Sequence, residues 1–158
     1  YFFLFFSRPM SFSKLSLKGR ALRYLAQREH SRAELQTKLA PHVEEGEDLA
    51  AVLDELEAKG FISAKRFVDS VIHTKAARYG ANRVLQELRH KGVDAELVAD
   101  ARERLRSTEL ERARVVWQRR FGTPPDSLQA RAKQMRFLAG RGFGGDVVRK
   151  VLRGRDEE

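Results

Sequence analysis

The segment HKGVDAELV at residues 90–98 is matched later in the chain by GRGFGGDVV at residues 140–148. Both segments place a glycine turn after one apolar stripe and before the next, as expected where two helices are joined by a tight connection. The chain therefore contains at least one internal repeat. The residues paired in this way are Gly92 with Gly142, Val93 with Phe143, and Leu88 with Leu138.

Candidate helix caps extend the repeat over most of the chain. Ser16, Ser63 and Thr108 each precede a group of three predicted helices, at spacings of 47 and 45 residues. A period in this range is typical of helical repeat proteins, in which each unit buries its apolar face against its neighbour. We therefore predict an all-α fold of three tandem three-helix repeats, stacked into an elongated, curved helical body.

Helical spacing of apolar residues persists along the chain, and strand-like alternation does not, so nine helices are expected. The local signals behind them are capping boxes at Ser31 with Glu34 and at Thr108 with Glu111, a stop at Pro41, and a stripe of Leu128, Met135 and Leu138.

The predicted units follow from these helices. Before them stands the leader YFFLFFSRP, whose apolar run is far shorter than the roughly 20 residues of a membrane span and has no basic segment ahead of it. We expect no membrane insertion or export, and we interpret the leader as a flexible or non-native start, with docking on the body as the alternative. The boundaries are 1–15 for this appendage, 16–60, 61–106 and 107–155 for the repeats, and 156–158 for an acidic tail.

Charge is distributed unevenly among these units. The chain of 158 residues holds 31 Lys and Arg against 22 Asp and Glu, a net charge of +9. The first 60 residues are balanced, whereas residues 61–106 hold 10 basic and 6 acidic side chains and residues 107–155 hold 12 and 4. A basic excess of this kind favours a polyanionic partner, either nucleic acid or an acidic protein face, although a solvated helical surface gives the same composition.

The residue inventory argues against several classes of enzyme. The chain has no Cys, which excludes disulfides, thiolate metal sites and cysteine nucleophiles. The four His residues, at 30, 42, 73 and 90, never occur three or four residues apart, so no helix face presents two imidazole ligands. A phosphate-binding GxxxxGK loop and a GxSxG elbow are also absent, and GRGFGG at 140–145 is interpreted as a turn between helices. We predict no catalytic activity, no metal and no cofactor.

At this point the chain resembles the RecX family of bacterial regulatory proteins over about residues 16–153. The segments that carry the resemblance are LEAKGFISAKRFVDSVIHTKAARYGANRVLQELRHKGV at 56–93 and RFLAGRGFGGDVVRKVL at 136–152. Departures from the family pattern occur at Ser63, Ala64 and Ala77. The matching positions in the first segment are Gly60, Phe61, Arg66, Phe67, Gly80, Arg83, Val84, Leu88, Lys91 and Gly92.

The resemblance implies a regulator that modulates, and mainly inhibits, the RecA recombinase. It implies binding in the helical groove of RecA filaments on DNA, a cytoplasmic location and no catalysis. We expect a monomer, with weak direct binding to single- or double-stranded DNA as a further property.

The residues expected to bind the filament form two basic clusters. Replacement of Arg131, Lys133 and Arg136 by Glu is predicted to weaken filament binding. The candidates are Lys75, Arg78, Arg83, Arg89 and Lys91 in the second unit, and Arg112, Arg119, Arg120, Arg131, Lys133, Arg136 and Arg141 in the third.

Aromatic residues beside these clusters could stack on nucleic-acid bases, but their helical spacing favours packing. We therefore expect Phe61, Phe67, Trp117, Phe121, Phe137 and Phe143 to be structural. Two other functions remain open, a helical repeat protein that binds DNA without RecA and a purely structural adaptor. A palindrome-reading repressor dimer is disfavoured by the three tandem units and the lack of dimerisation heptads.

Overall fold

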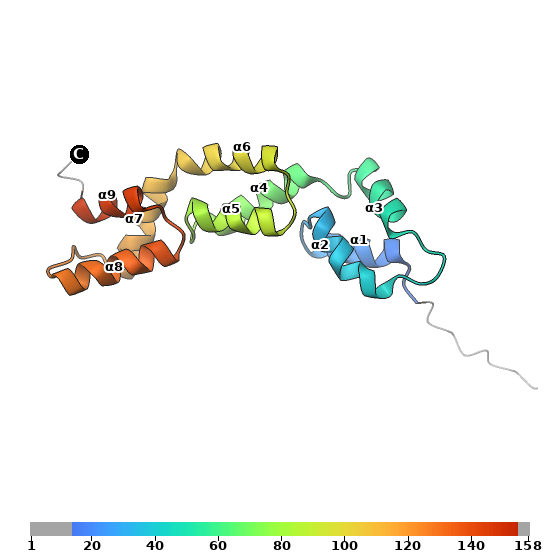
Figure 1. Ribbon diagram of the computed structural model, residues 1–158, viewed down its shortest axis with the longest axis horizontal. Helices are drawn as coiled ribbons and strands as arrows, with labels where there is room; N and C mark the ends of the chain where they lie inside the picture. Colours follow the sequence, from blue (N-terminus) through green and yellow to red (C-terminus); the bar gives the residue numbers. More distant parts are fainter. Residues whose placement is uncertain (1–13, 155–158) are drawn as a thin grey trace, which may run out of the picture.

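The computed structural model describes residues 14–154, and in that range the chain is helical with no strand. Three groups of three helices follow one another along the long axis of the body, with α1–α3 at one end and α7–α9 at the other (Figure 1). The elongated all-α fold is therefore confirmed. The helices are α1 Leu17–Gln27, α2 Arg32–Leu39, α3 Leu49–Ala58, α4 Ala64–Lys75, α5 Ala81–His90, α6 Ala95–Arg106, α7 Glu109–Arg120, α8 Leu128–Gly140 and α9 Gly145–Arg153.

Most helices begin after a short polar side chain that accepts a hydrogen bond from a backbone N–H of the first turn. Ser16 accepts from the Gly19 N–H, and Ser63 accepts from the Arg66 N–H. At α2 the capping box is complete, because Ser31 accepts from the Glu34 N–H while the Glu34 carboxylate accepts from the Ser31 N–H. Such a cap is worth about 1 kcal/mol to a helix.

Of two local predictions about helix ends, one is wrong and one is confirmed. The Thr108 hydroxyl makes no cap hydrogen bond to α7, because it donates to the Leu105 carbonyl and accepts from Arg112 Nε. The predicted stop at Pro41 is confirmed, because α2 ends at Leu39; one 3₁₀ turn, Ala40–His42, follows with the proline in its first positions. A proline is accepted there because its missing N–H would have no partner in a first turn.

Two apolar residues expected in the interior face solvent instead. Phe61 is 48% exposed, because its neighbour Ile62 enters the core of the first unit in its place. Leu128 is 86% exposed as the first residue of α8, which at 13 residues is longer than the 9-residue α9 on which it packs. The stripe along α8 is therefore shorter than its sequence pattern indicates.

Each group of helices has a separate hydrophobic core. Leu35, Leu39 and Leu56 are fully buried in the first, and Phe67 and Leu88 are buried in the second. The third core includes Leu138 and Phe143. Full burial of one such side chain contributes about 1.5–3 kcal/mol. Separate cores fit a chain of three units, while the exact residues at which one unit passes into the next stay a prediction.

The units are joined by one recurring contact. The turn after the middle helix of each later unit lies against the start of the middle helix of the unit before it. Thus the α5–α6 turn meets the start of α2, where Ser31 Oγ donates to the Lys91 carbonyl at 2.7 Å. In the same way the α8–α9 turn meets the start of α5, where the Gly80 N–H donates to the Arg141 carbonyl at 2.8 Å and the Asn82 N–H to the Gly142 carbonyl at 3.2 Å.

None of the helices in residues 14–154 is both long enough and apolar enough to cross a bilayer.

Candidate polyanion-binding surface

The contact between the second and third units brings cationic and aromatic side chains into one row. Its members come from the end of α4, the α4–α5 connection, the start of α5, and the ends of α7 and α8. We call the set the cation–aromatic row. It consists of Lys75, Tyr79, Arg83, Arg120, Phe121, Phe137 and Arg141.

Tyr79 and Phe137 hold the row together by binding cations on their ring faces. The guanidinium carbon of Arg141 lies 5.4 Å from the Tyr79 ring centroid and 5.2 Å from that of Phe137. The guanidinium carbon of Arg83, on α5, lies 4.2 Å from the Tyr79 ring centroid. A cation over an aromatic ring gains roughly 0.5–2 kcal/mol, depending on exposure. Arg141 therefore links the second and third units through two rings.

The row continues to the end of α7. Arg120 lies 5.5 Å from the Phe137 centroid and 6.0 Å from that of Phe121, and the two phenyl rings meet edge to face at 5.4 Å. At the other end, Lys75 Nζ lies 5.8 Å from the Tyr79 centroid. The rings position these side chains without neutralising them.

Carboxylates do not neutralise the row either. Within residues 14–154, none of Lys75, Arg83, Arg120 and Arg141 forms an ion pair. Glu109 lies beneath the junction, where its carboxylate accepts from the backbone N–H groups of Ala81 and Gly144, both at 3.4 Å. A guanidinium stacked on a ring keeps in-plane donors for phosphate or carboxylate oxygens, so the row suits a polyanion.

Arg112 is also at this junction, but its donors are used inside the protein. Its Nη1 donates to the carbonyls of Ala76 and Tyr79, both at 2.9 Å, and its Nη2 donates to the Leu105 carbonyl at 3.0 Å. Burial lowers the pKa of the Arg112 guanidinium, an effect that the charge of Glu109 opposes. Arg112 thus fixes the α4–α5 connection onto α7, and we leave it out of the proposed binding surface.

The five candidates of the second unit lie near opposite ends of α5. Lys75 and Arg83 lie near its start, in the row, and Arg78 is exposed in the same α4–α5 connection. Arg89 and Lys91 lie at its far end, beside the first unit, where Lys91 pairs with Glu34 at 3.4 Å. The five residues therefore do not form one patch.

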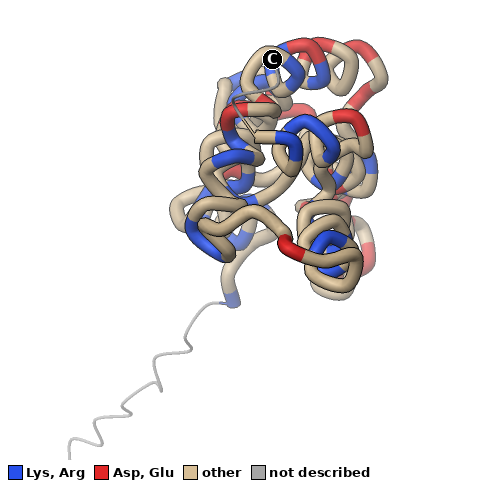
Figure 2. The backbone as a smooth tube through the Cα atoms, turned by 90° about the vertical axis from the view of Figure 1, so that its left-hand side faces the viewer, with Lys and Arg blue, Asp and Glu red and all other residues tan. Residues whose placement is uncertain are grey.

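The remaining third-unit candidates are spread over two helices. Arg119 is exposed on α7 and borders a groove towards α9. Lys133 and Arg136 are exposed on α8, and Arg131 is half-buried there. Figure 2 views the body from its α7–α9 end and shows Lys and Arg positions spread over the helices with acidic positions among them. Side-chain contacts, rather than backbone position alone, define the row.

Tyr79 is the binding-surface residue that the sequence did not single out. The signal is a spacing of four residues between cation and ring, which occurs at Lys75 and Tyr79, at Tyr79 and Arg83, and at Phe137 and Arg141. Residues four apart are neighbours on a helix surface, which applies to Phe137 and Arg141 at the end of α8. Tyr79 lies between α4 and α5, so for its two pairs the spacing is a signal only once the connection is known. Of the six aromatics expected to be structural, Phe67 and Phe143 are buried and Trp117 and Phe137 pack partly buried against the third core.

A metal site does not appear in the part of the chain that the structure describes, where no group of three or more His, Asp or Glu side chains could hold an ion.

Fold and surface together define a class of protein, a three-unit helical repeat body with a cationic surface at the contact between its second and third units. Comparison with known proteins makes the class specific. Models of the first, second and third three-helix domains of RecX match residues 18–56, 65–101 and 107–152, respectively. The chain belongs to the RecX family.

Individual relatives agree over nearly the full length. The chain is 57% identical over 145 residues to "Regulatory protein RecX" of Leptothrix cholodnii, covering 92% of each chain. It is 46% identical over 149 residues to the protein of the same name from Ralstonia pickettii, covering 94% of each. The crystal structure of RecX from Lactobacillus salivarius has the same fold, with a TM-score of 0.72 at 20% identity, over 89% of this chain and 94% of that one.

Proposed function

We propose that this protein regulates the RecA recombinase by binding RecA filaments on DNA, mainly to inhibit them. Membership of the RecX family supports a regulatory role, since the relatives carry the name Regulatory protein RecX. The observation that carries the proposal is the cation–aromatic row, which holds four cations free of carboxylates across two units of an elongated body.

The row fits a nucleoprotein filament for a physical reason. A filament on DNA carries phosphates along its length, and a partner that presents cations along an extended path can neutralise several of them. The body is elongated (Figure 1). The rings of Tyr79 and Phe137 position the cations, since Arg141 lies over both of them. The proposal needs no chemistry beyond binding, and we therefore propose a regulator rather than an enzyme.

The test adds the purified protein to RecA, single-stranded DNA and ATP, and follows filament assembly and ATP hydrolysis. Lower ATP hydrolysis and shorter or fewer filaments at near-stoichiometric protein are expected. No effect on either quantity would overturn the proposal.

Direct DNA binding without RecA is the second candidate function, because phosphates alone could occupy the row. In that case affinity for free DNA falls with salt at a log–log slope of about −0.9 per phosphate neutralised. A slope that reflects several phosphates, unchanged by RecA, would favour this second function. Weak binding to free DNA, with much tighter binding when RecA is present, would favour the first.

A further inference from the structure

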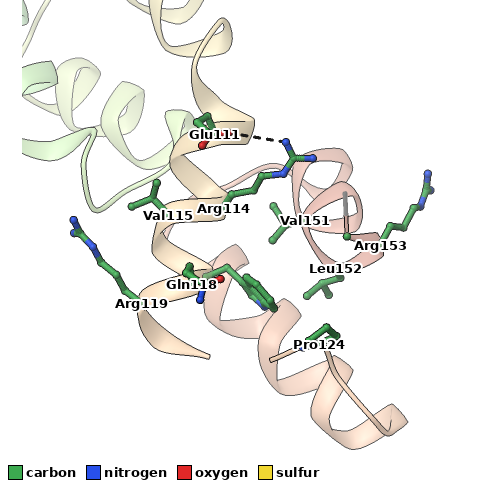
Figure 3. A pocket seen from close by; sticks show the side chains of 11 residues that line it. Glu111, Arg114, Val115, Gln118, Arg119, Pro124, Val151, Leu152 and Arg153 are labelled. Carbon is green, nitrogen blue, oxygen red and sulfur yellow. Dashed lines mark ion pairs between the residues drawn. The ribbon is translucent and has the colours of Figure 1, made fainter. Parts of the chain in front are cut away.

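A groove between α7 and α9 lies apart from the cation–aromatic row. It has a volume of about 670 Å³, in the range of protein ligand sites, and it opens to solvent along one side. Figure 3 shows Val151 and Leu152 directed from α9 towards α7, with Arg119 and Arg153 at opposite edges. The lining is completed by Glu111, Arg114, Val115, Trp117, Gln118, Pro124 and Gly154.

The floor of the groove is apolar. Its accessible apolar surface comes from Trp117, Pro124 and Val115, which is 39% exposed, while Val151 and Leu152 lie buried beneath it in the third core. A smaller hollow of about 150 Å³ also borders Val115 and Arg119 and continues along α7 to Ala77 of the second unit. An exposed apolar depression of this length fits a peptide segment better than a small solute.

The edges of the groove are cationic. Arg114 is engaged with Glu111, at 4.0 Å, so this pair adds little net charge. Arg119 and Arg153 form no ion pair within residues 14–154 and lie on opposite sides of the apolar floor. A ligand that spans the groove therefore meets an arginine at each edge.

We infer that this groove is a docking site for an acidic peptide segment that carries a large apolar side chain. The apolar side chain contacts Val115, Trp117 and Pro124, and flanking carboxylates pair with Arg119 and Arg153. Nucleic acid fits less well, because Trp117 is the one aromatic residue of the lining and its Nε1–H is already donated to Gln134, at 2.8 Å. The inference does not depend on the proposed function, since the groove and the cation–aromatic row involve different side chains.

The chain provides its own probe for the test, because Trp117 is the only tryptophan and lines the groove. The ligand is a synthetic peptide of about ten residues, rich in Asp and Glu, with Leu and Phe on one helical face and no tryptophan. The expected result is a saturable change in tryptophan fluorescence with a Kd of about 10–100 μM. Titration calorimetry on the same samples detects any binding that the fluorescence does not report.

Variants of peptide and protein separate the two parts of the inference. Replacement of Leu and Phe in the peptide by Ser, and the double variant Arg119→Glu with Arg153→Glu, should each weaken binding at least about tenfold. Val115→Asp should act similarly through the floor. The matched control is Arg102→Glu on α6, an exposed arginine outside the groove, which should leave the Kd unchanged.

Several results would overturn the inference. These are the absence of both heat and fluorescence change at about millimolar peptide, equal affinity for the Ser-substituted peptide, or tighter binding of an oligothymidylate at the same site. A fluorescence change that depends on protein concentration without peptide would assign the groove to a second copy of this chain. None of these results bears on filament binding, which is measured separately with RecA.

Discussion

The two contacts between units share one geometry but differ in chemistry. In both, a turn from the later unit lies on the start of the middle helix of the earlier one. Between the first and second units the contact is polar: Ser31 Oγ donates to the Lys91 carbonyl, and the buried Glu34 carboxylate, held by Arg28 of its own unit, pairs across the contact with Lys91. Between the second and third, backbone meets backbone at Gly80 and Gly142.

This difference determines what each contact tolerates. The polar contact depends on charges and therefore on pH. The backbone contact depends on the absence of side chains, because a Cβ at Gly80 would lie 2.3 Å from the Gly142 carbonyl carbon. The close approach also carries the cation–aromatic row, since Tyr79 and Arg141 meet only when the two units touch. Both contacts exclude a side chain, since a Cβ at Gly92 in the first would lie 2.7 Å from the Ala33 Cβ. The first contact adds a charged pairing that responds to pH, whereas the second rests on backbone contact.

The largest effect is expected from Gly80→Ala. The added Cβ meets backbone atoms of Gly142 and Phe143, which cannot rotate away, so the second and third units must separate. We expect a loss of about 3–5 kcal/mol in the free energy of unfolding, measured by urea denaturation. Gly140→Ala is the matched control, because nothing lies within 4 Å of a Cβ there; it should stabilise α8 by up to about 1 kcal/mol. Equal effects of the two substitutions would contradict the close contact.

Arg112→Ala should have the next largest effect. The substitution leaves the carbonyls of Ala76, Tyr79 and Leu105 without their donor, and a loss of about 2–4 kcal/mol follows. Arg102→Ala, at an exposed position of α6, controls for loss of an arginine and should have little effect on stability. If both variants unfold at the same urea concentration as the unsubstituted chain, Arg112 is not structural.

Glu34→Gln addresses the polar contact. Burial opposes ionisation of this carboxylate, but hydrogen bonds from Arg28 and the Ser31 N–H, with the charges of Arg28 and Lys91, lower its pKa to about 2. A lowered pKa stabilises the fold above the ordinary value of 4.5, and this stability is lost as pH falls towards 2. The substitution should cost about 2 kcal/mol at neutral pH and flatten the pH dependence between those values.

The control for this measurement is Glu55→Gln. Glu55 is also paired, with Lys18 and Lys59, but it is exposed on the surface, where solvent screens the pairing. Its substitution should change stability much less than Glu34→Gln. A pH profile of unfolding that is unaltered by Glu34→Gln would show that the charge of Glu34, paired with Arg28 in its own unit and Lys91 in the next, does not stabilise the fold.

The smallest expected effect is at Tyr79, within the row. Tyr79→Phe keeps the ring and should be neutral, whereas Tyr79→Leu removes the cation–aromatic contacts and should cost about 1 kcal/mol. A double-mutant cycle with Arg141→Gln isolates the term that links the units. A coupling energy near zero would mean that Arg141 is positioned by the backbone contact alone.

The helical fold was predictable because its determinants are local. The caps at Ser16, Ser31 and Ser63 act on the residues that follow them, and apolar spacing sets the buried face. The errors arise where a distant or competing partner intervenes. Thr108 is drawn away from its cap by Leu105 and Arg112, and the two adjacent apolar residues Phe61 and Ile62 compete for one place in the core.

The candidate binding surface was predictable only in part. Basic composition predicts Arg83 and Arg141 as candidates, but Arg141 lies over the Tyr79 ring, beside Arg83, only because the second and third units pack against each other. The same docking converts Arg112 from a candidate contact into a structural residue. Which cations remain free is therefore decided by long-range packing, about which local sequence patterns carry little information.

The central proposal is that the cation–aromatic row binds the RecA filament. Its most direct test compares the triple variant Arg83→Glu, Arg120→Glu and Arg141→Glu with a control of equal charge change, Arg23→Glu, Lys65→Glu and Arg102→Glu. The control residues are exposed and lie outside the row. Both variants must first retain the helicity of the unsubstituted protein.

The quantity measured is the protein concentration that halves RecA ATP hydrolysis on single-stranded DNA. We predict an increase of at least about tenfold for the row variant, equivalent to 1.4 kcal/mol, and less than about twofold for the control. Equal increases for the two variants would show that net charge rather than the row controls binding, and would contradict the claim.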